Sequence, residues 1–86
     1  MFKIVFSKQA AKKLIRIQKK LALSIRRKID EIAKAPFKKH AHVEKLQGID
    51  GYRLRIGNWR VIYQVKNEEL IIIVVKVETR GEVYKK

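Results

Sequence analysis

Apolar and polar residues alternate along Tyr52–Val65, and the dipeptide Gly57-Asn58 divides this stretch into two halves. A period of two is typical of a β-strand with one buried face, and a Gly-Asn pair is typical of a two-residue turn. The stretch therefore predicts a tight antiparallel hairpin in which Arg55 lies opposite Arg60 on the polar face. Five residues of the hairpin are expected to be substantially buried: Tyr52, Leu54, Trp59, Val61 and Tyr63.

The first part of the chain has a helical pattern instead. Apolar residues recur at steps of mostly three and four over residues 10–33, which predicts two amphipathic helices in a hairpin. A short strand over Phe2–Phe6 precedes them, Ser7 is a good N-cap for the first helix, and Pro36 ends the second. The sequence leaves the junction between the helices open within about Lys20–Ser24.

Two further strands complete the predicted sheet. The region after Pro36 has no clear period and is expected to be irregular, ending in a short strand around Glu44–Gln47. The run Leu70–Val77 is almost entirely apolar, which suits a central strand covered on both sides. We therefore expect a single domain over residues 1–86 of the α+β class, with an antiparallel sheet of about four strands and the N-terminal two-helix hairpin packed on one face.

Basic residues strongly outnumber acidic ones. The 86 residues include 22 Lys+Arg and 8 Asp+Glu, for a formal net charge of +14. Such a charge is expected of a protein whose partner is a polyanion, and nucleic acid is a better candidate than an anionic membrane surface. The basic residues on the outer faces of the helices are interpreted as solvated groups that add long-range attraction for phosphate.

Several classes of site are excluded by composition. The chain has no cysteine, which removes disulfides, thiolate nucleophiles and Cys-based zinc sites, and fits a reducing cytoplasm. The N-terminal "MFKIVFSK" is too short and too interrupted by lysine for a signal peptide, and no apolar run approaches the ~20 residues of a membrane span. The only histidines, His40 and His42, are interpreted as plain loop residues, so we expect neither a metal site nor a small-molecule cofactor.

The predicted pairing of Arg55 with Arg60 needs a physical reason. Two like charges directly opposite each other on antiparallel strands are destabilising. An anion bound between the two side chains would offset this cost and would explain why the sequence keeps both arginines. The alternative is that they are ordinary solvated arginines in a strongly basic protein.

Two blocks of the sequence resemble a known family. The block "EKLQGIDGYRLRIGNWRVIYQV", followed by an apolar strand and the terminal "TRGEVYKK", is similar to the RelE/ParE superfamily of toxins from toxin–antitoxin pairs. The resemblance covers the full length and implies a RelE-like fold. In the RelE branch it implies a metal-independent endoribonuclease that enters the ribosomal A site and cuts messenger RNA during translation. The implied partners are the ribosome with its message and a cognate acidic antitoxin.

The resemblance also implies roles for particular residues. In the family, the ribose 2′-hydroxyl attacks the neighbouring phosphate, so cations must neutralise a phosphorane that carries more charge than the ground state. Arg55 and Arg60 resemble the hairpin cations of the family, and Arg80 resembles the cation after the last strand. Tyr84 resembles the terminal tyrosine that stacks on a base of the message, although a tail aromatic packed on the sheet is the alternative.

The general base stays unassigned at this point. Arg53 takes a position where some members carry lysine, and an arginine keeps its proton too firmly to act as a base. Glu44 is one candidate, because some relatives place a glutamate just before a segment similar to "KLQG"; the alternative is a surface carboxylate in a lysine-rich loop. Thr79 stands where many relatives have a histidine, so Arg80 would have to serve by charge stabilisation or proton donation.

Two other functions compete with the nuclease. One is a ParE-like inhibitor of DNA gyrase, a branch that is similar in fold but generally lacks the full set of RelE cations and the terminal tyrosine. The other is a non-catalytic RNA-binding module, for which the net charge would suffice but the terminal "RGEVYKK" would have no particular purpose. The presence of Arg60, Arg80 and Tyr84 favours the nuclease.

Overall fold

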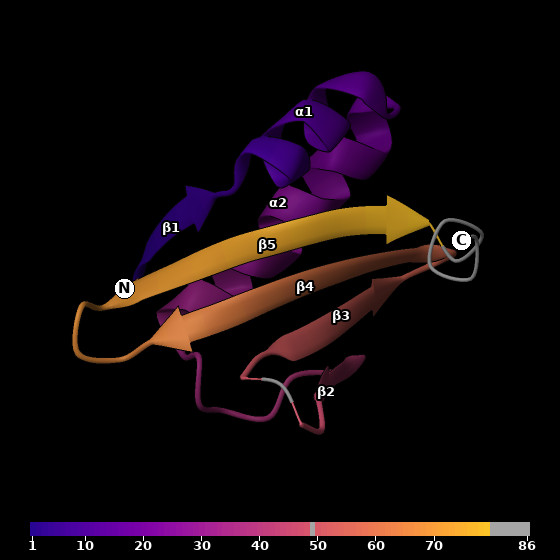
Figure 1. Ribbon diagram of the computed structural model, residues 1–86. Coiled ribbons are helices and arrows are strands. Elements are labelled where there is room, and N and C mark those ends of the chain that lie inside the picture. Colours follow the sequence, from indigo (N-terminus) through magenta and orange to yellow (C-terminus); the bar gives the residue numbers. More distant parts are fainter. Residues whose placement is uncertain (49, 80–86) are drawn as a thin grey trace.

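A layer of two helices covers one face of a five-stranded sheet in the computed structural model, which describes residues 1–48 and 50–79 (Figure 1). The strands lie in the order β1-β5-β4-β3-β2. All neighbouring pairs are antiparallel except β1 and β5, which are parallel. The expected α+β class, with a helical hairpin on one face of the sheet, is confirmed; the sheet has five strands where about four were expected, and one pair, β1 with β5, is parallel. In chain order the elements are β1 (Lys3–Phe6), α1 (Lys8–Arg16), α2 (Lys19–Lys34), β2 (Val43–Lys45), β3 (Tyr52–Ile56), β4 (Trp59–Lys66) and β5 (Ile71–Thr79).

The first strand and the start of α1 are joined to β5 by one serine. The backbone N–H of Ala10 donates to Ser7 Oγ at 3.1 Å, so Ser7 is the expected N-cap. The same hydroxyl donates to the carbonyl of Val75 at 2.6 Å. Strand β1 therefore leads directly into a helix whose first turn is fixed against the sheet.

The junction between the helices lies earlier than expected. Helix α1 ends at Arg16 and α2 begins at Lys19, so the interval Lys20–Ser24 that the sequence left open is inside α2. Ile17 is extended, with φ −80° and ψ 169°, and its N–H donates to the carbonyl of Lys13. No glycine or proline marks this break, and the apolar period continues through it, which is why the pattern alone missed it.

The core lies between the helices and the hairpin face of the sheet. Leu54, Val61 and Tyr63 are buried as expected, whereas Tyr52 and Trp59 are half-buried at the margin. Burial of each large apolar side chain contributes about 1.5–3 kcal/mol relative to an exposed one, so these contacts hold the hairpin in register. The other buried residues are Ala10, Leu14, Ile25, Ile29, Ile32, Ala33, Ile72, Val74 and Val77.

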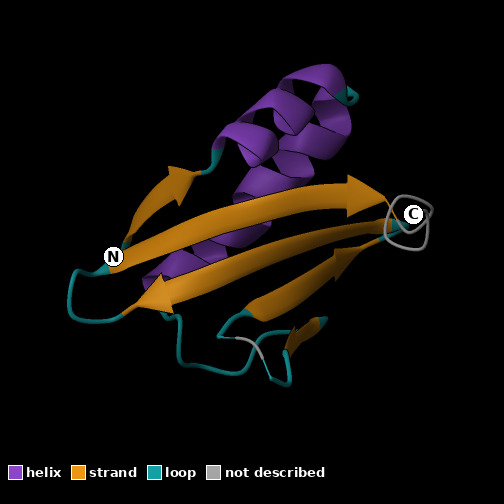
Figure 2. Cartoon of the chain, in the orientation of Figure 1, coloured by secondary structure: helices purple, strands orange, loops and turns teal. Residues whose placement is uncertain are grey.

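The expectation that the last strand is covered on both sides is wrong. Strand β5 lies inside the sheet, between β1 and β4, but its burial alternates, with Ile72 and Val74 buried and their neighbours partly exposed. The described helices cover only one face, as Figure 2 shows in purple. A bulge adds to the misleading pattern: Tyr63 pairs with Val74 and Ile62 with Lys76, so Val75 has no partner on β4.

Helix α2 ends at Lys34, directly before Ala35 and Pro36, as the sequence predicts. The following loop leads to β2, which pairs with β3 at the edge of the sheet (Figure 2). No helix among the described residues is long and apolar enough to cross a membrane.

Candidate functional site

The β3–β4 hairpin has the register that its sequence predicts. Ile56 pairs with Trp59 and Arg55 with Arg60 across the antiparallel ladder. Gly57 has φ +57°, and Asn58 does not have a positive φ, which is the pattern of a type II′ turn. This turn fixes the pairing, because its first central residue needs the left-handed region that glycine enters without strain.

Arg60 carries an unsatisfied donor. Its Nε is buried and has no hydrogen-bond partner among the described residues. A buried donor without an acceptor costs about 1–3 kcal/mol, so the side chain is suited to an acceptor that residues 1–48 and 50–79 do not supply.

A small cavity lies beside this donor. It has a volume of about 150 Å³ and is lined by Arg55 and Arg60, by the turn residues Gly57 and Asn58, and by Trp59. This volume is several times that of a water molecule in the liquid. Two guanidinium groups at the wall of one small cavity form a candidate anion-binding site.

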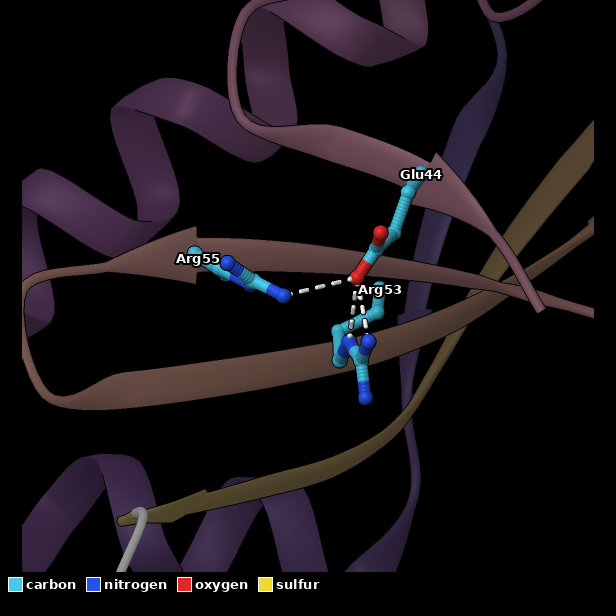
Figure 3. A network of polar contacts seen from close by, with 3 residues as sticks. All are labelled: Glu44, Arg53 and Arg55. Atoms are coloured by element: carbon cyan, nitrogen blue, oxygen red, sulfur yellow. Dashed lines mark hydrogen bonds and ion pairs between the residues drawn. The ribbon is translucent and has the colours of Figure 1, made fainter.

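A carboxylate lies on the other side of Arg55. Figure 3 shows Glu44, on β2, pointing toward Arg53 and Arg55 on β3. Its Oε1 accepts hydrogen bonds from Arg53 Nε at 3.0 Å and from Arg55 Nη2 at 3.1 Å, and it also forms an ion pair with Arg53 Nη2. The pairing of β2 with β3 places Glu44 directly opposite Arg53, which explains this contact. The sequence-based candidates Glu44, Arg53 and Arg55 are therefore neighbours.

The two arginines change the acidity of Glu44. The hydrogen bond from Arg53 holds the pKa of the Glu44 carboxyl below its ordinary value of 4.5; desolvation opposes this shift, and the charges of Arg53 and Arg55 add to it. The carboxylate is consequently ionised at neutral pH, but the two arginines weaken it as a base.

The remaining sequence-based candidates cannot be placed. Arg80 and Tyr84 lie outside the described residues, and their roles stay predictions. His40 donates a hydrogen bond from Nε2–H to the carbonyl of Ala35 at 2.7 Å, a contact that holds the loop after α2. Within residues 1–48 and 50–79, no three side chains of the metal-binding types gather into a metal site.

Sequence reasoning missed one feature next to the site. A larger cavity of about 580 Å³ is bordered by Arg55 on β3 and by Arg27 and Lys28 on α2. The two helical residues belong to the basic stripes that the sequence interpreted as solvated faces. No local signal marks them, because only the packing of α2 beneath the sheet brings them near Arg55.

Comparison with known proteins identifies the family and the fold of this chain. The sequence model of the family described as "ParE toxin of type II toxin-antitoxin system, parDE" matches residues 4–84. The isolated Escherichia coli RelE toxin is similar at 26% identity and a TM-score of 0.80, over 98% of this chain and 92% of that one. The archaeal RelE of the RelE–RelB complex from Pyrococcus horikoshii is similar at 30% identity and a TM-score of 0.80, over 93% of this chain and 96% of that one.

A more distant relative shares the fold. The YoeB/ParE toxin from Agrobacterium tumefaciens is 18% identical with a TM-score of 0.78, over 90% of this chain and 96% of that one. A search of curated proteins found no match. The family match and the shared fold lead to one conclusion. This chain belongs to the RelE/ParE superfamily of toxins from type II toxin–antitoxin systems.

Proposed function

We propose that this toxin acts as a ribosome-dependent endoribonuclease that cleaves messenger RNA during translation. The observation that carries the proposal is the position of Arg60, opposite Arg55 on one small cavity and with a buried Nε that no described residue accepts from. A phosphate would supply the missing acceptor and would separate the two like charges.

The proposed chemistry is an attack by a ribose 2′-hydroxyl on the adjacent phosphate. The 2′-oxygen forms a bond to phosphorus, the bond to the 5′-oxygen of the next nucleotide breaks, and the products are a 2′,3′-cyclic phosphate and a 5′-hydroxyl. Negative charge on the phosphate oxygens increases in the transition state. The guanidinium groups of Arg55 and Arg60 stabilise this charge, and they can do so without a metal ion.

Glu44 is the proposed acceptor of the 2′ proton. In the free protein its Oε1 is held by Arg53 and Arg55, which lower its pKa. When a phosphate between Arg55 and Arg60 attracts Arg55, Glu44 loses the hydrogen bond from Arg55 and becomes a stronger base, while Arg53 remains bonded to it. Arg53 thus controls the base and need not be one itself. Arg80, as a charge stabiliser or proton donor, and Tyr84, as a stacking platform, complete the proposal outside the described residues.

The ribosome has a defined task in this scheme. The carboxylate that would take the proton is engaged by two arginines in the free protein, so the isolated site is poorly prepared for reaction. Precise alignment of the 2′-hydroxyl with the phosphate can supply several kcal/mol of the barrier. We therefore infer that the ribosome provides this alignment, and that a cognate acidic antitoxin blocks the site until it is released, since the similar RelE toxins occur in complexes with RelB.

Inhibition of DNA gyrase is the second candidate. The observation that favours it is the matched family itself, which is described as ParE. The gyrase reading gives no purpose to the pairing of Arg55 with Arg60 and is therefore second.

One paired assay decides between the two candidates. The purified toxin is added to a translating extract with a defined message, and separately to gyrase with relaxed plasmid. The nuclease proposal predicts messages cut within the translated region and unaffected supercoiling. Intact messages together with blocked supercoiling would assign the protein to the gyrase inhibitors. EDTA cannot test metal independence in the translating extract, because ribosomes need magnesium. Any slow cutting of free RNA by the purified toxin should persist in EDTA.

A further inference from the structure

A groove follows the C-terminal half of α2. It consists of the cavity of about 580 Å³ beside Arg55 and a second cavity of about 460 Å³ between α2 and the loop that follows it. Lys28 and Glu31 line both cavities, so the two are adjacent. Each volume is within the range of about 300–1,000 Å³ that is usual for ligand sites. We call the two cavities together the α2 groove.

The α2 groove is strongly basic. Glu31 is the one carboxylate among its described lining residues. The cations that line it come from the helix, from the loop and from β3, so they surround the groove from three directions and create a positive potential inside it. They are Arg27, Lys28, Lys34, Lys38, Lys39 and Arg55.

The groove offers little to an apolar partner. The large apolar side chains that are exposed among the described residues include Ile15, Leu23 and Phe37, and none of the exposed set lines either cavity. Ile32 and Leu54, which line the second cavity, are only 1% and 0% exposed, and the half-buried Ile56 lines the first cavity. An amphipathic helix needs exposed anchors in its groove, so the lining favours an extended polyanion.

The groove also meets the candidate site. Arg55 lines both the α2 groove and the small cavity that it shares with Arg60. A nucleic-acid strand with one phosphate between these two arginines would therefore find the basic groove beside its next nucleotides.

We propose that the α2 groove binds the sugar-phosphate backbone of the single-stranded message next to the cleavage point. This inference rests on the proposed function, because it takes the cavity of Arg55 and Arg60 as the place of the reacting phosphate. Lysine and arginine contact phosphate without reading the base, so the groove adds affinity and direction to the bound strand and little sequence preference.

The test measures binding without cleavage. A labelled RNA of about 12 nucleotides with 2′-O-methyl riboses cannot react, and its length covers a site of this kind. Its affinity for the full-length toxin is measured by fluorescence anisotropy over a range of salt concentrations. Each phosphate contact with a single strand contributes about 0.7 to the slope of log K against log salt.

The groove variant is Lys34→Ala/Lys38→Ala, and the matched control is Lys12→Ala/Lys20→Ala. All four lysines are exposed, and the two control residues line none of the cavities described above. The proposal predicts that the slope of log K against log salt becomes shallower by up to about 1.4 in the groove variant, because two phosphate contacts are lost, and by much less in the control. Inorganic phosphate, which is small enough for the cavity of Arg55 and Arg60, should bind both variants alike.

Three results would overturn the inference. The first is an equal change in the salt slope of the groove variant and of the control, which would mean that the lysines attract RNA only at long range. The second is the absence of RNA binding at any salt concentration. The third is a groove variant that keeps its RNA affinity but loses its affinity for an acidic peptide, which would assign the groove to a protein partner. The RNA in this test cannot be cut, so binding is measured separately from cleavage. A toxin that fails in the cleavage assay but shows the predicted slopes would contradict the nuclease proposal and leave the groove proposal intact.

Discussion

Arg55 on β3 lies directly opposite Arg60 on β4, and the Glu44 carboxylate contacts only Arg55 of these two. Glu44 accepts from Arg55 and from Arg53, whereas the buried Nε of Arg60 has no acceptor among the described residues. Among the described residues, Arg55 thus has a carboxylate partner, whereas Arg60, which lies opposite Glu78 on β5, keeps an Nε donor that is available to an anion.

Phosphate should stabilise the protein through this pair. Wild-type toxin and Arg60→Ala are melted with and without phosphate, and with chloride at equal ionic strength as the control. Without phosphate, the variant should melt at the same temperature as wild type or slightly above it, since like-charge repulsion and an unsatisfied donor are removed. Phosphate should raise the melting temperature of wild type more than that of the variant, because a ligand stabilises only the state that binds it. Equal shifts would place the anion elsewhere.

The ion pairs of Glu44 should make the stability of the fold depend on pH in the acidic range. The folded pKa of Glu44 is below its ordinary value of 4.5, so its contribution is complete above that pH and is lost as the pH falls through the lowered pKa. Melting curves of wild type and Glu44→Gln are compared from neutral pH downward. We expect a small advantage of wild type near pH 7 that disappears below about pH 4.5. An advantage that stays constant with pH would contradict the assigned ion pairs.

Glu44 should also matter for cleavage. If it takes the 2′ proton, Glu44→Gln lowers the translation-coupled cleavage rate by about 10²–10⁴-fold, the usual contribution of a general base. Glu69→Gln is the matched control, because it removes an exposed carboxylate from the turn between β4 and β5. A Glu44→Gln toxin that cuts at the full rate would return Glu44 to a purely structural role.

Ionisation of the Tyr63 phenol should destabilise the fold at high pH. Its ring stacks on Tyr52 with centroids 5.3 Å apart, and burial together with that neighbour raises its pKa from 10.0 to about 12. Because the folded state favours the neutral phenol, this group contributes fully to the free energy of unfolding below pH 10. The contribution is lost between about pH 10 and 12, at up to ~1.4 kcal/mol per pH unit. The free energy of unfolding of Tyr63→Phe should fall less steeply in that window than that of wild type. Identical slopes would show that the phenol is accessible.

The sequence predicted the parts of this fold that depend on neighbouring residues. The hairpin register followed from a period of two and from the Gly57-Asn58 turn, and the start of α1 followed from the side chain of Ser7. These signals are local, and tertiary contacts did not override them.

The parts that it missed depend on contacts between distant segments. The helix junction at Ile17 has no breaking residue, and the bulge at Val75 is visible only once β5 is paired with β4. The contact of Glu44 with two arginines requires β2 to pair with β3, and the α2 groove requires the packing of α2 beneath the sheet. A resemblance to a family pointed to Glu44, but periodicity could not have placed its carboxylate.

The most direct test of the proposed function is the translation-coupled cleavage rate of Arg60→Ala, measured beside its melting temperature. Arg16→Ala is the matched control, because it removes an exposed arginine from the end of α1. If Arg60 stabilises the phosphorane, its loss lowers the rate by about 10²–10³-fold, as for the loss of one donor to a transition-state oxyanion, while the melting temperature stays at or slightly above that of wild type. A variant that still cuts at the full rate, or one that melts well below wild type, would contradict this role and make Arg60 a structural residue.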